Sequence, residues 1–210
     1  MTDEIGVMCE RLGIAVDARQ VALLHGFLDL LQRWNRSFNL TAVREREAML
    51  THHLADCLAI VPALRSRGPK RVLDVGSGGG LPGVIIATLM PGTDVTCVDD
   101  VGKKAAFVQQ VAGSLGISNL HAVHSRVEKL TGAPFDLITS RAFASLADFT
   151  AVTERHLAAD GVWVAMKGRT PDDEMAALPS CLEVFHVEQL SVPNMDAARC
   201  LVWIKPRRDS

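Results

Sequence analysis

The sequence predicts an α/β protein with a doubly wound, mostly parallel sheet that follows an N-terminal helical segment. Apolar residues keep a helical spacing up to about residue 65, and strand-like and helical patterns alternate from residue 70 onward. Two strand-like runs joined by a short loop then end the sequence. With 210 residues, 48% of them hydrophobic, the chain is long enough for one well-packed domain. We therefore expect a helical extension over residues 1–66 and a sheet domain over residues 67–210, packed as one compact unit.

Two amphipathic helices are expected in the N-terminal segment. The first begins after Asp17, a residue type that caps helices. Its apolar stripe consists of Val21, Leu24, Phe27, Leu28, Leu31 and Trp34. The second helix spans Glu47 to Leu64, with Leu50, Leu54, Cys57, Leu58, Val61 and Leu64 on one stripe. The stretch between them (WNRSFNLTAV, residues 34–43) is too polar and irregular to continue either helix, and residues 65–71 (RSRGPKR) predict a linker.

From residue 71 the pattern changes to alternating strands and helices. Strands are expected over residues 71–75, 95–99, 120–125, 136–140 and 162–167, and helices over 83–90 and 103–115. This alternation is typical of a parallel sheet covered by helices on both faces. The runs 183–192 and 200–206 are joined by a loop too short for a helical crossover, so they should be antiparallel. We expect an open parallel sheet that ends in one reversed edge strand.

Composition and charge restrict the function classes. No apolar run reaches the roughly 20 residues of a membrane span, and the acidic start MTDEIG does not resemble a signal peptide. The five cysteines are scattered without metal-ligand spacing, which favours reduced, mostly buried thiols and no metal site in a cytoplasmic protein. The net charge of −2 provides no general attraction toward nucleic acid.

The most informative segment is DVGSGGGLPG, residues 74–83. Gly76, Gly78 and Gly80 alternate at the carboxyl end of a predicted parallel strand, where ligands of open α/β sheets bind. Glycines allow positive φ and close approach of a ligand, and the following helix directs free N–H groups toward it. Residues 78–83 match G-x-G-x-x-G, which alone is a weak signal. Asp74 before the loop gives the order D-x-G-x-G-x-G, which favours S-adenosylmethionine and resembles class I methyltransferases.

An acidic residue at the end of the second strand is the expected ribose ligand. Asp99 lies 23 residues after Gly76, where a carboxylate can accept hydrogen bonds from both ribose hydroxyls. Asp100 is an alternative that spacing cannot separate, and either residue could instead cap the helix that begins near Lys103. A carboxylate at this position could also bind the ribose of NAD, so it indicates a nucleoside cofactor but does not distinguish between the two.

Two further elements end the third and fourth strands. Residues 125–128 (SRVE) can meet an adenine ring with backbone and side-chain groups. Arg141 lies over the cleft, where it could reach the carboxylate of the methionine portion or a nucleic-acid phosphate. A surface ion pair is the alternative reading of Arg141.

Seven segments together resemble one family. They are WNRSFNLT (34–41), HHLADCL (52–58), DVGSGGGLPG (74–83), DDVGKKAAFVQQV (99–111), SRVE (125–128), SRAFASL (140–146) and MKG (166–168). This set is similar to the bacterial small-subunit ribosomal RNA methyltransferase G family, also called glucose-inhibited division protein B, over nearly the whole chain. The resemblance implies a cytoplasmic Rossmann-like enzyme that forms N7-methylguanine in the 530-loop region of 16S rRNA, acting on that RNA or on the small ribosomal subunit.

Carried over by position, the family's cofactor contacts are Gly76, Leu81, Val127, Glu128 and Arg141. To these the glycine-loop and ribose arguments add Gly78 and Asp99. Asp100 departs from relatives, which often have serine there, and this leaves open which aspartate holds the ribose.

The implied chemistry requires no dedicated catalytic base. Guanine N7 has a lone pair in the ring plane and the sulfonium methyl is already activated, so alignment and desolvation matter most. We therefore expect no catalytic triad and no metal, with at most a positioning role for Arg141. The adjacent His52 and His53 are expected to pack a helix and to form a hydrogen bond across the N-terminal segment.

Candidate RNA contacts come from the rim of the predicted cleft. The cations are Arg33, Arg36, Arg44, Arg46, Lys103, Lys104 and Lys167, and Trp34 or Phe38 could stack on a base. A core position for Trp34 and plain solvation of the arginines are the alternatives. Other functions considered are a small-molecule methyltransferase, an NAD-dependent oxidoreductase and a non-catalytic RNA-binding module on the same fold.

Overall fold

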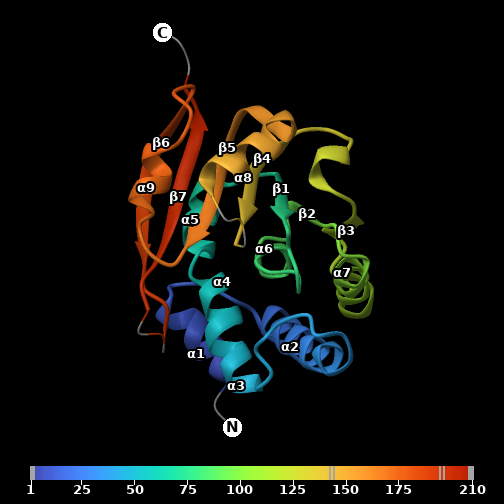
Figure 1. Ribbon diagram of the computed structural model, residues 1–210. Coiled ribbons are helices and arrows are strands. Elements are labelled where there is room, and N and C mark those ends of the chain that lie inside the picture. The colour runs from blue at the N-terminus through green and yellow to red at the C-terminus, as the bar shows by residue number, and fades with distance from the viewer. Residues whose placement is uncertain (1–2, 142, 144, 194, 196, 208–210) are drawn as a thin grey trace.

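The computed structural model describes residues 3–141, 143, 145–193, 195 and 197–207. Its strands form one sheet in the order β3-β2-β1-β4-β5-β7-β6 (Figure 1). The strands are β1 Arg71–Val75, β2 Asp94–Asp99, β3 Leu120–His124, β4 Phe135–Ser140, β5 Leu157–Lys167, β6 Leu182–Leu190 and β7 Arg199–Pro206. β1 to β5 pair in parallel, and β7 pairs antiparallel with both β5 and β6. The predicted α/β sheet with its last strand antiparallel is confirmed.

The position of the reversed strand differs from the expectation. β7 lies between β5 and β6, so the edge strand is β6, which runs parallel to β5. The sequences explain this order. β7 contains the continuous apolar run Cys200–Ile204, which is buried throughout, whereas β6 is mostly half-buried and has only Leu182 buried. An uninterrupted apolar strand suits the interior of a sheet and a mixed strand suits its edge.

Helices cover both faces of the sheet and its lower end. They are α1 Glu4–Arg11, α2 Ala18–Phe38, α3 Arg46–Met49, α4 Asp56–Leu58, α5 Val61–Arg67, α6 Gly83–Leu89, α7 Gly102–Leu115, α8 Leu146–Thr153 and α9 Asp172–Ala176. A π-helical turn, η1, spans Leu50–Ala55, and short 3-10 turns, η2 and η3, span Val127–Lys129 and Glu154–His156. In Figure 1, α1 to α4 lie below the sheet, next to α6 and α7. Among the described residues, no helix has the length and apolarity that crossing a bilayer requires.

The first long helix begins where it was predicted but ends later. The backbone N–H of Gln20 donates to Asp17 Oδ1 (2.7 Å), and the Asp17 N–H donates to Gln20 Oε1 (3.1 Å), which completes a capping box. The helix continues to Phe38, so the expectation that residues 34–38 leave it is wrong. Asn35 accounts for the difference: it is buried, donates to the Val43 carbonyl (2.8 Å) and accepts from the Thr41 N–H (2.8 Å). These bonds satisfy a polar residue on the buried face.

The second predicted helix is a series of short pieces. α3, η1, α4 and α5 replace the single helix expected over residues 47–64. The apolar face is nevertheless correct, since Leu54, Cys57, Leu58, Val61 and Leu64 are all buried. Pro62 in the first turn of α5 has no N–H to donate, so the chain starts a new helix there.

One core joins the N-terminal helices to the sheet. Buried side chains of α2, including Phe27 and Leu31, belong to the same cluster as Val84 of α6 and Phe107 of α7. A second cluster on the opposite face gathers Leu146 and Phe149 of α8 around Trp163 of β5. The helical extension therefore packs directly on the elements that follow the glycine loop.

Candidate functional site

The glycine loop connects β1 to α6 and is attached to β2. Gly76, Gly78 and Gly80 have φ values of +66°, +57° and +79°, a region that favours glycine. The N–H groups of Gly76 and Ser77 donate to the Val98 carbonyl at 2.9 and 3.3 Å. A Cβ on Gly80 would lie 2.6 Å from Val84 Cγ2. The loop thus requires glycine for its conformation and for its packing.

Asp99 connects this loop to the end of β2. Its Oδ2 accepts from the Gly78 N–H (2.9 Å), its Oδ1 accepts from the Val101 N–H (2.9 Å), and Lys104 Nζ lies 3.5 Å from Oδ2. Asp99 is buried, whereas Asp100 is exposed. α7 begins at Gly102 after Val101, and among the described residues no side chain caps it, so neither aspartate acts as its N-cap. Asp99 therefore holds the glycine loop against the end of β2.

A cavity of about 340 Å³ opens between the ends of β1, β2 and β3. It is lined by Val75, Gly76, Val98, Asp99, Asp100, Ser125, Arg126, Val127, Glu128, Phe143 and Val152. The cavity therefore brings together Gly76, Asp99, Val127 and Glu128, four of the predicted cofactor contacts. The lining combines apolar side chains with the three carboxylates of Asp99, Asp100 and Glu128, which suits a flat base attached to a ribose, so these residues fit an adenosine group.

The other predicted contacts lie outside this lining. Gly78 does not line the cavity itself, but its N–H donates to Asp99, which does. Leu81 is buried below the loop, where its N–H donates to the Ser77 carbonyl (3.0 Å). Arg141 belongs to a separate group of polar residues that includes His53 and Asp56. The binding roles of all these residues remain predictions.

Asp74 holds the start of α6 from below the loop. It is fully buried, and its Oδ2 accepts from the Gly83 N–H (2.7 Å). Its Oδ1 has no hydrogen-bond partner among the described residues. Burial raises the pKa of the Asp74 carboxyl to about 7, although the Gly83 N–H and Arg141 act in the opposite direction.

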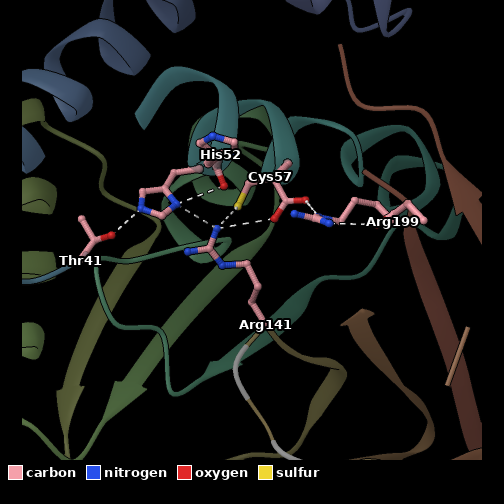
Figure 2. A network of polar contacts seen from close by, with 8 residues as sticks. Thr41, His52, Cys57, Arg141 and Arg199 are labelled. Carbon is pink, nitrogen blue, oxygen red and sulfur yellow. Dashed lines mark hydrogen bonds and ion pairs between the residues drawn. The ribbon is translucent and has the colours of Figure 1, made fainter. Parts of the chain in front are cut away.

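Arg141 contacts the π-helical turn and α4 (Figure 2). Its Nη1 lies 3.5 Å from His53 Nδ1, 3.7 Å from Asp56 Oδ2 and 3.9 Å from Cys57 Sγ. Asp56 Oδ1 also accepts from Arg199 Nε (2.8 Å), so one carboxylate serves two arginines. The sequence singled out Arg141 but missed Asp56 and Arg199.

His53 forms the expected hydrogen bond across the N-terminal segment. Its Nε2 lies 2.6 Å from Thr41 Oγ1, whereas His52 is exposed. Burial, with a smaller contribution from Arg141, lowers the pKa of His53 to about 4. The ring is therefore neutral near pH 7 and adds no charge to this group.

Several candidate RNA contacts have partners within the protein. Lys104 pairs with Asp99, Lys167 pairs with Glu174 (2.8 Å) and Arg46 pairs with Asp29. Lys103 Nζ donates to the Phe38 carbonyl (2.8 Å), and Arg44 lies 3.4 Å from Asn39 Oδ1. Arg33 and Arg36 are exposed.

The two aromatic candidates at this rim differ in exposure. Trp34 is partly buried against Phe107 (5.5 Å between ring centroids), as the core alternative supposed. Phe38 packs on Trp34 (4.9 Å) but is 43% exposed. Of the two rings, Phe38 is therefore the one more exposed to solvent.

Within the described part of the chain, no cluster of histidine, cysteine and carboxylate side chains could hold a metal ion. All five cysteines are free, and four of them are buried.

Comparison with known proteins identifies relatives that are methyltransferases, which agrees with a cavity that fits an adenosine group. The family model "GidB: rRNA small subunit methyltransferase G" matches residues 20–202. The chain is 56% identical to the ribosomal RNA small subunit methyltransferase G of Acidovorax sp. (strain JS42) over 206 residues, which cover 93% of this chain and 91% of that protein. It is 54% identical to the protein of the same name from Paracidovorax citrulli, over 95% of this chain and 87% of that protein.

Solved structures show similarity in fold. TrmN from Thermus thermophilus aligns with a TM-score of 0.56 at 20% identity, over 72% of this chain and 49% of that one. An S-adenosylmethionine-dependent methyltransferase from Thiobacillus denitrificans, in complex with S-adenosyl-L-homocysteine, aligns with a TM-score of 0.52 at 12% identity. This alignment covers 72% of this chain and 91% of that one.

Proposed function

Because this chain belongs to the rRNA small subunit methyltransferase G family, we propose that it methylates N7 of a guanine in the 530-loop region of 16S rRNA. The methyl donor is S-adenosylmethionine, which the family and the fold share. The substrate is the 16S RNA or the small ribosomal subunit that contains it, and the reaction takes place in the cytoplasm. The single observation in the structure that supports this function is the cavity beside the glycine loop.

The residues around this cavity suit the donor. Asp99 would accept from the ribose hydroxyls, since its Oδ1 retains a lone pair beyond the one that accepts the Val101 N–H, whereas Oδ2 already meets the Gly78 N–H and Lys104 Nζ. Val127 and Phe143 offer apolar surface to the adenine ring, and Glu128 lies beside them. When bound, the donor supplies a methyl group that its sulfonium centre has already activated.

The protein's contribution is alignment and exclusion of water. Guanine N7 carries an in-plane lone pair, so transfer does not require prior removal of a proton from the base. Arg141 follows β4, the strand next to β1, and its contacts with His53 and Asp56 restrict its orientation. We assign it a positioning role at this edge of the sheet.

The proposal is tested first by ligand binding and by mapping the product. Calorimetric titration with S-adenosylmethionine and with NAD should show binding of the former. In cells that lack the protein, 16S rRNA should have lost N7-methylguanine from the 530-loop region. Binding of NAD alone, or loss of a different methyl group, would refute the proposal.

A pair of variants tests which aspartate holds the ribose. Asp99→Asn should raise the dissociation constant for S-adenosylmethionine at least about tenfold, because a charge-assisted hydrogen bond is lost. Asp100→Asn is the matched control at the exposed neighbour and should change the constant less than about twofold. The reverse order would assign the ribose to Asp100.

A further inference from the structure

Two arginines from distant parts of the sequence meet at the carboxyl edge of the parallel strands. Arg141 follows Ser140, the last residue of β4. Arg199 is the first residue of β7, which is antiparallel to β5, so that Cys200 pairs with Lys167 at the end of β5. The reversed direction of β7 therefore brings its first residue to the edge where the parallel strands end. Both guanidinium groups contact Asp56, and Figure 2 shows Arg141 and Arg199 in the same network of polar contacts.

Asp56 fixes the orientation of both guanidinium groups. It is buried, and it accepts from Arg199 Nε at 2.8 Å and lies 3.7 Å from Arg141 Nη1. Arg199 Nη1 also donates to the Ala198 carbonyl (2.9 Å). Within the described residues, the Nη2 groups of both arginines have no hydrogen bond, and about a quarter of each side chain is exposed (26% and 27%). Each arginine thus retains a donor that its contacts with the described residues do not use.

The charges in this group do not balance. Two guanidinium groups share the single carboxylate of Asp56, and His53 is neutral because burial lowers its pKa to about 4. The neighbouring Lys167 is already paired with Glu174. Asp74 also interacts with Arg141, but it is only partly ionised near pH 7 because burial raises its pKa to about 7. The partly buried excess of positive charge that remains is unfavourable unless an anion compensates it.

The sheet order indicates which anion fits. The adenosine-sized cavity lies at the ends of β1, β2 and β3, whereas β7 is three strands away from β1. With about 4.8 Å between neighbouring strands, Arg199 lies on the order of 14 Å from β1. The donor's nucleoside would occupy the edge at β1 to β3, which would leave the edge at β4, β5 and β7 for the methyl acceptor. For an RNA acceptor, the anion at that edge is a backbone phosphate.

We propose that Arg199 and Arg141, held together on Asp56, bind a backbone phosphate of the RNA next to the target guanine. This inference rests on the proposed function and adds a substrate-binding site to it. Guanidinium groups suit this task because their fixed donors match phosphate oxygens. Such a contact positions the RNA without reading its sequence. Asp56 is the positioning residue that holds both arginines in place.

The test compares Arg199→Gln with Arg19→Gln, which removes the same charge from an exposed residue at the start of α2. The substrate is a 16S rRNA fragment that contains the 530 loop. Arg199→Gln should raise the KM for this RNA about tenfold, and the slope of log KM against log salt should fall by about 0.7. The dissociation constant for S-adenosylmethionine should stay within about twofold of the unaltered protein, and Arg19→Gln should leave all three quantities unchanged.

Arg199→Lys serves as a second variant if the glutamine variant unfolds, because lysine keeps the charge and can still pair with Asp56. It lacks the planar donors of arginine, so the KM for RNA should rise about threefold at an unchanged salt slope.

Three results would overturn the inference. An unchanged KM in the Arg199 variants would make the ion pair purely structural. A weaker affinity for S-adenosylmethionine with an unchanged KM for RNA would assign the pair to the donor's carboxylate. A complete lack of methylation by the unaltered protein of both this fragment and the small ribosomal subunit would refute the proposed function, and this inference with it.

Discussion

The buried carboxyl group of Asp74 makes the stability of this protein depend on pH in a defined direction. In the folded chain its pKa is about 7, because burial disfavours the charged form, whereas its ordinary value is 3.8. Between these values the folded protein keeps a proton that the unfolded chain has lost. Folding therefore becomes less favourable as the pH rises toward 7. Asp74→Asn removes this titration and keeps an oxygen that can accept from the Gly83 N–H.

The size of this pH-dependent change in stability depends on how much of the pH range between the two pKa values is measured. Each pKa unit corresponds to about 1.4 kcal/mol, and the interval from pH 5 to pH 7 spans two units. The free energy of unfolding of Asp74→Asn, minus that of the unaltered protein, should therefore increase by about 3 kcal/mol between pH 5 and pH 8. The difference isolates Asp74, because all other titrating groups are common to both proteins.

Urea unfolding followed by circular dichroism at several pH values measures this difference. Asp173→Asn, an exposed position in α9, provides the control, and its difference from the unaltered protein should vary by less than about 0.5 kcal/mol over the same range. If the free energy of unfolding of Asp74→Asn minus that of the unaltered protein does not change with pH, burial does not raise the pKa of Asp74 in the folded protein. That result would refute the argument from burial.

Two other expectations concern packing and thiol reactivity. Gly83→Ala would bring a Cβ into collision with Cys97 Sγ and within 2.9 Å of Asp74 Oδ2, and should destabilise the fold by about 3 kcal/mol. Thermal unfolding should show that the stability of Gly92→Ala is within about 0.5 kcal/mol of that of the unaltered protein, since nothing lies within 4 Å of its added Cβ. Equal losses of stability in both variants would contradict the packing argument. A thiol reagent should label one of the five cysteines in the native protein, because Cys181 is exposed while burial raises the pKa of Cys57 to about 12 and that of Cys9 to about 11. Cys181→Ser should abolish this labelling, and rapid reaction of a second thiol would show that the buried cysteines are accessible.

Local signals in the sequence predicted much of the sheet. The bounds of β1 agree with the expectation because a short apolar run lies between a Pro-Gly linker and the glycine loop. Asp17 was predictable because a helix start depends on a residue and its neighbours three positions away. The order of β6 and β7 was wrong because hairpin pairing fixes which strands are neighbours but not which of them joins the rest of the sheet.

The candidate site was predictable where it consists of one loop and strand ends. Gly76, Asp99, Val127 and Glu128 line one cavity because the carboxyl ends of parallel strands meet at the same edge. The contact between Asp56 and Arg199 had no local signal, since 143 positions separate the two residues. It depends on where β7 enters the sheet, which tertiary packing decides.

The order of strands also affects how the chain can fold during translation. β7 separates β6 from β5, so β6 has no neighbour in the sheet until residues 199–206 have left the ribosome. The same segment carries Arg199, the second guanidinium on Asp56. A nascent chain that already contains the glycine loop and the nucleoside cavity therefore lacks one of the two arginines, and the last strand to emerge completes both the sheet and the arginine pair.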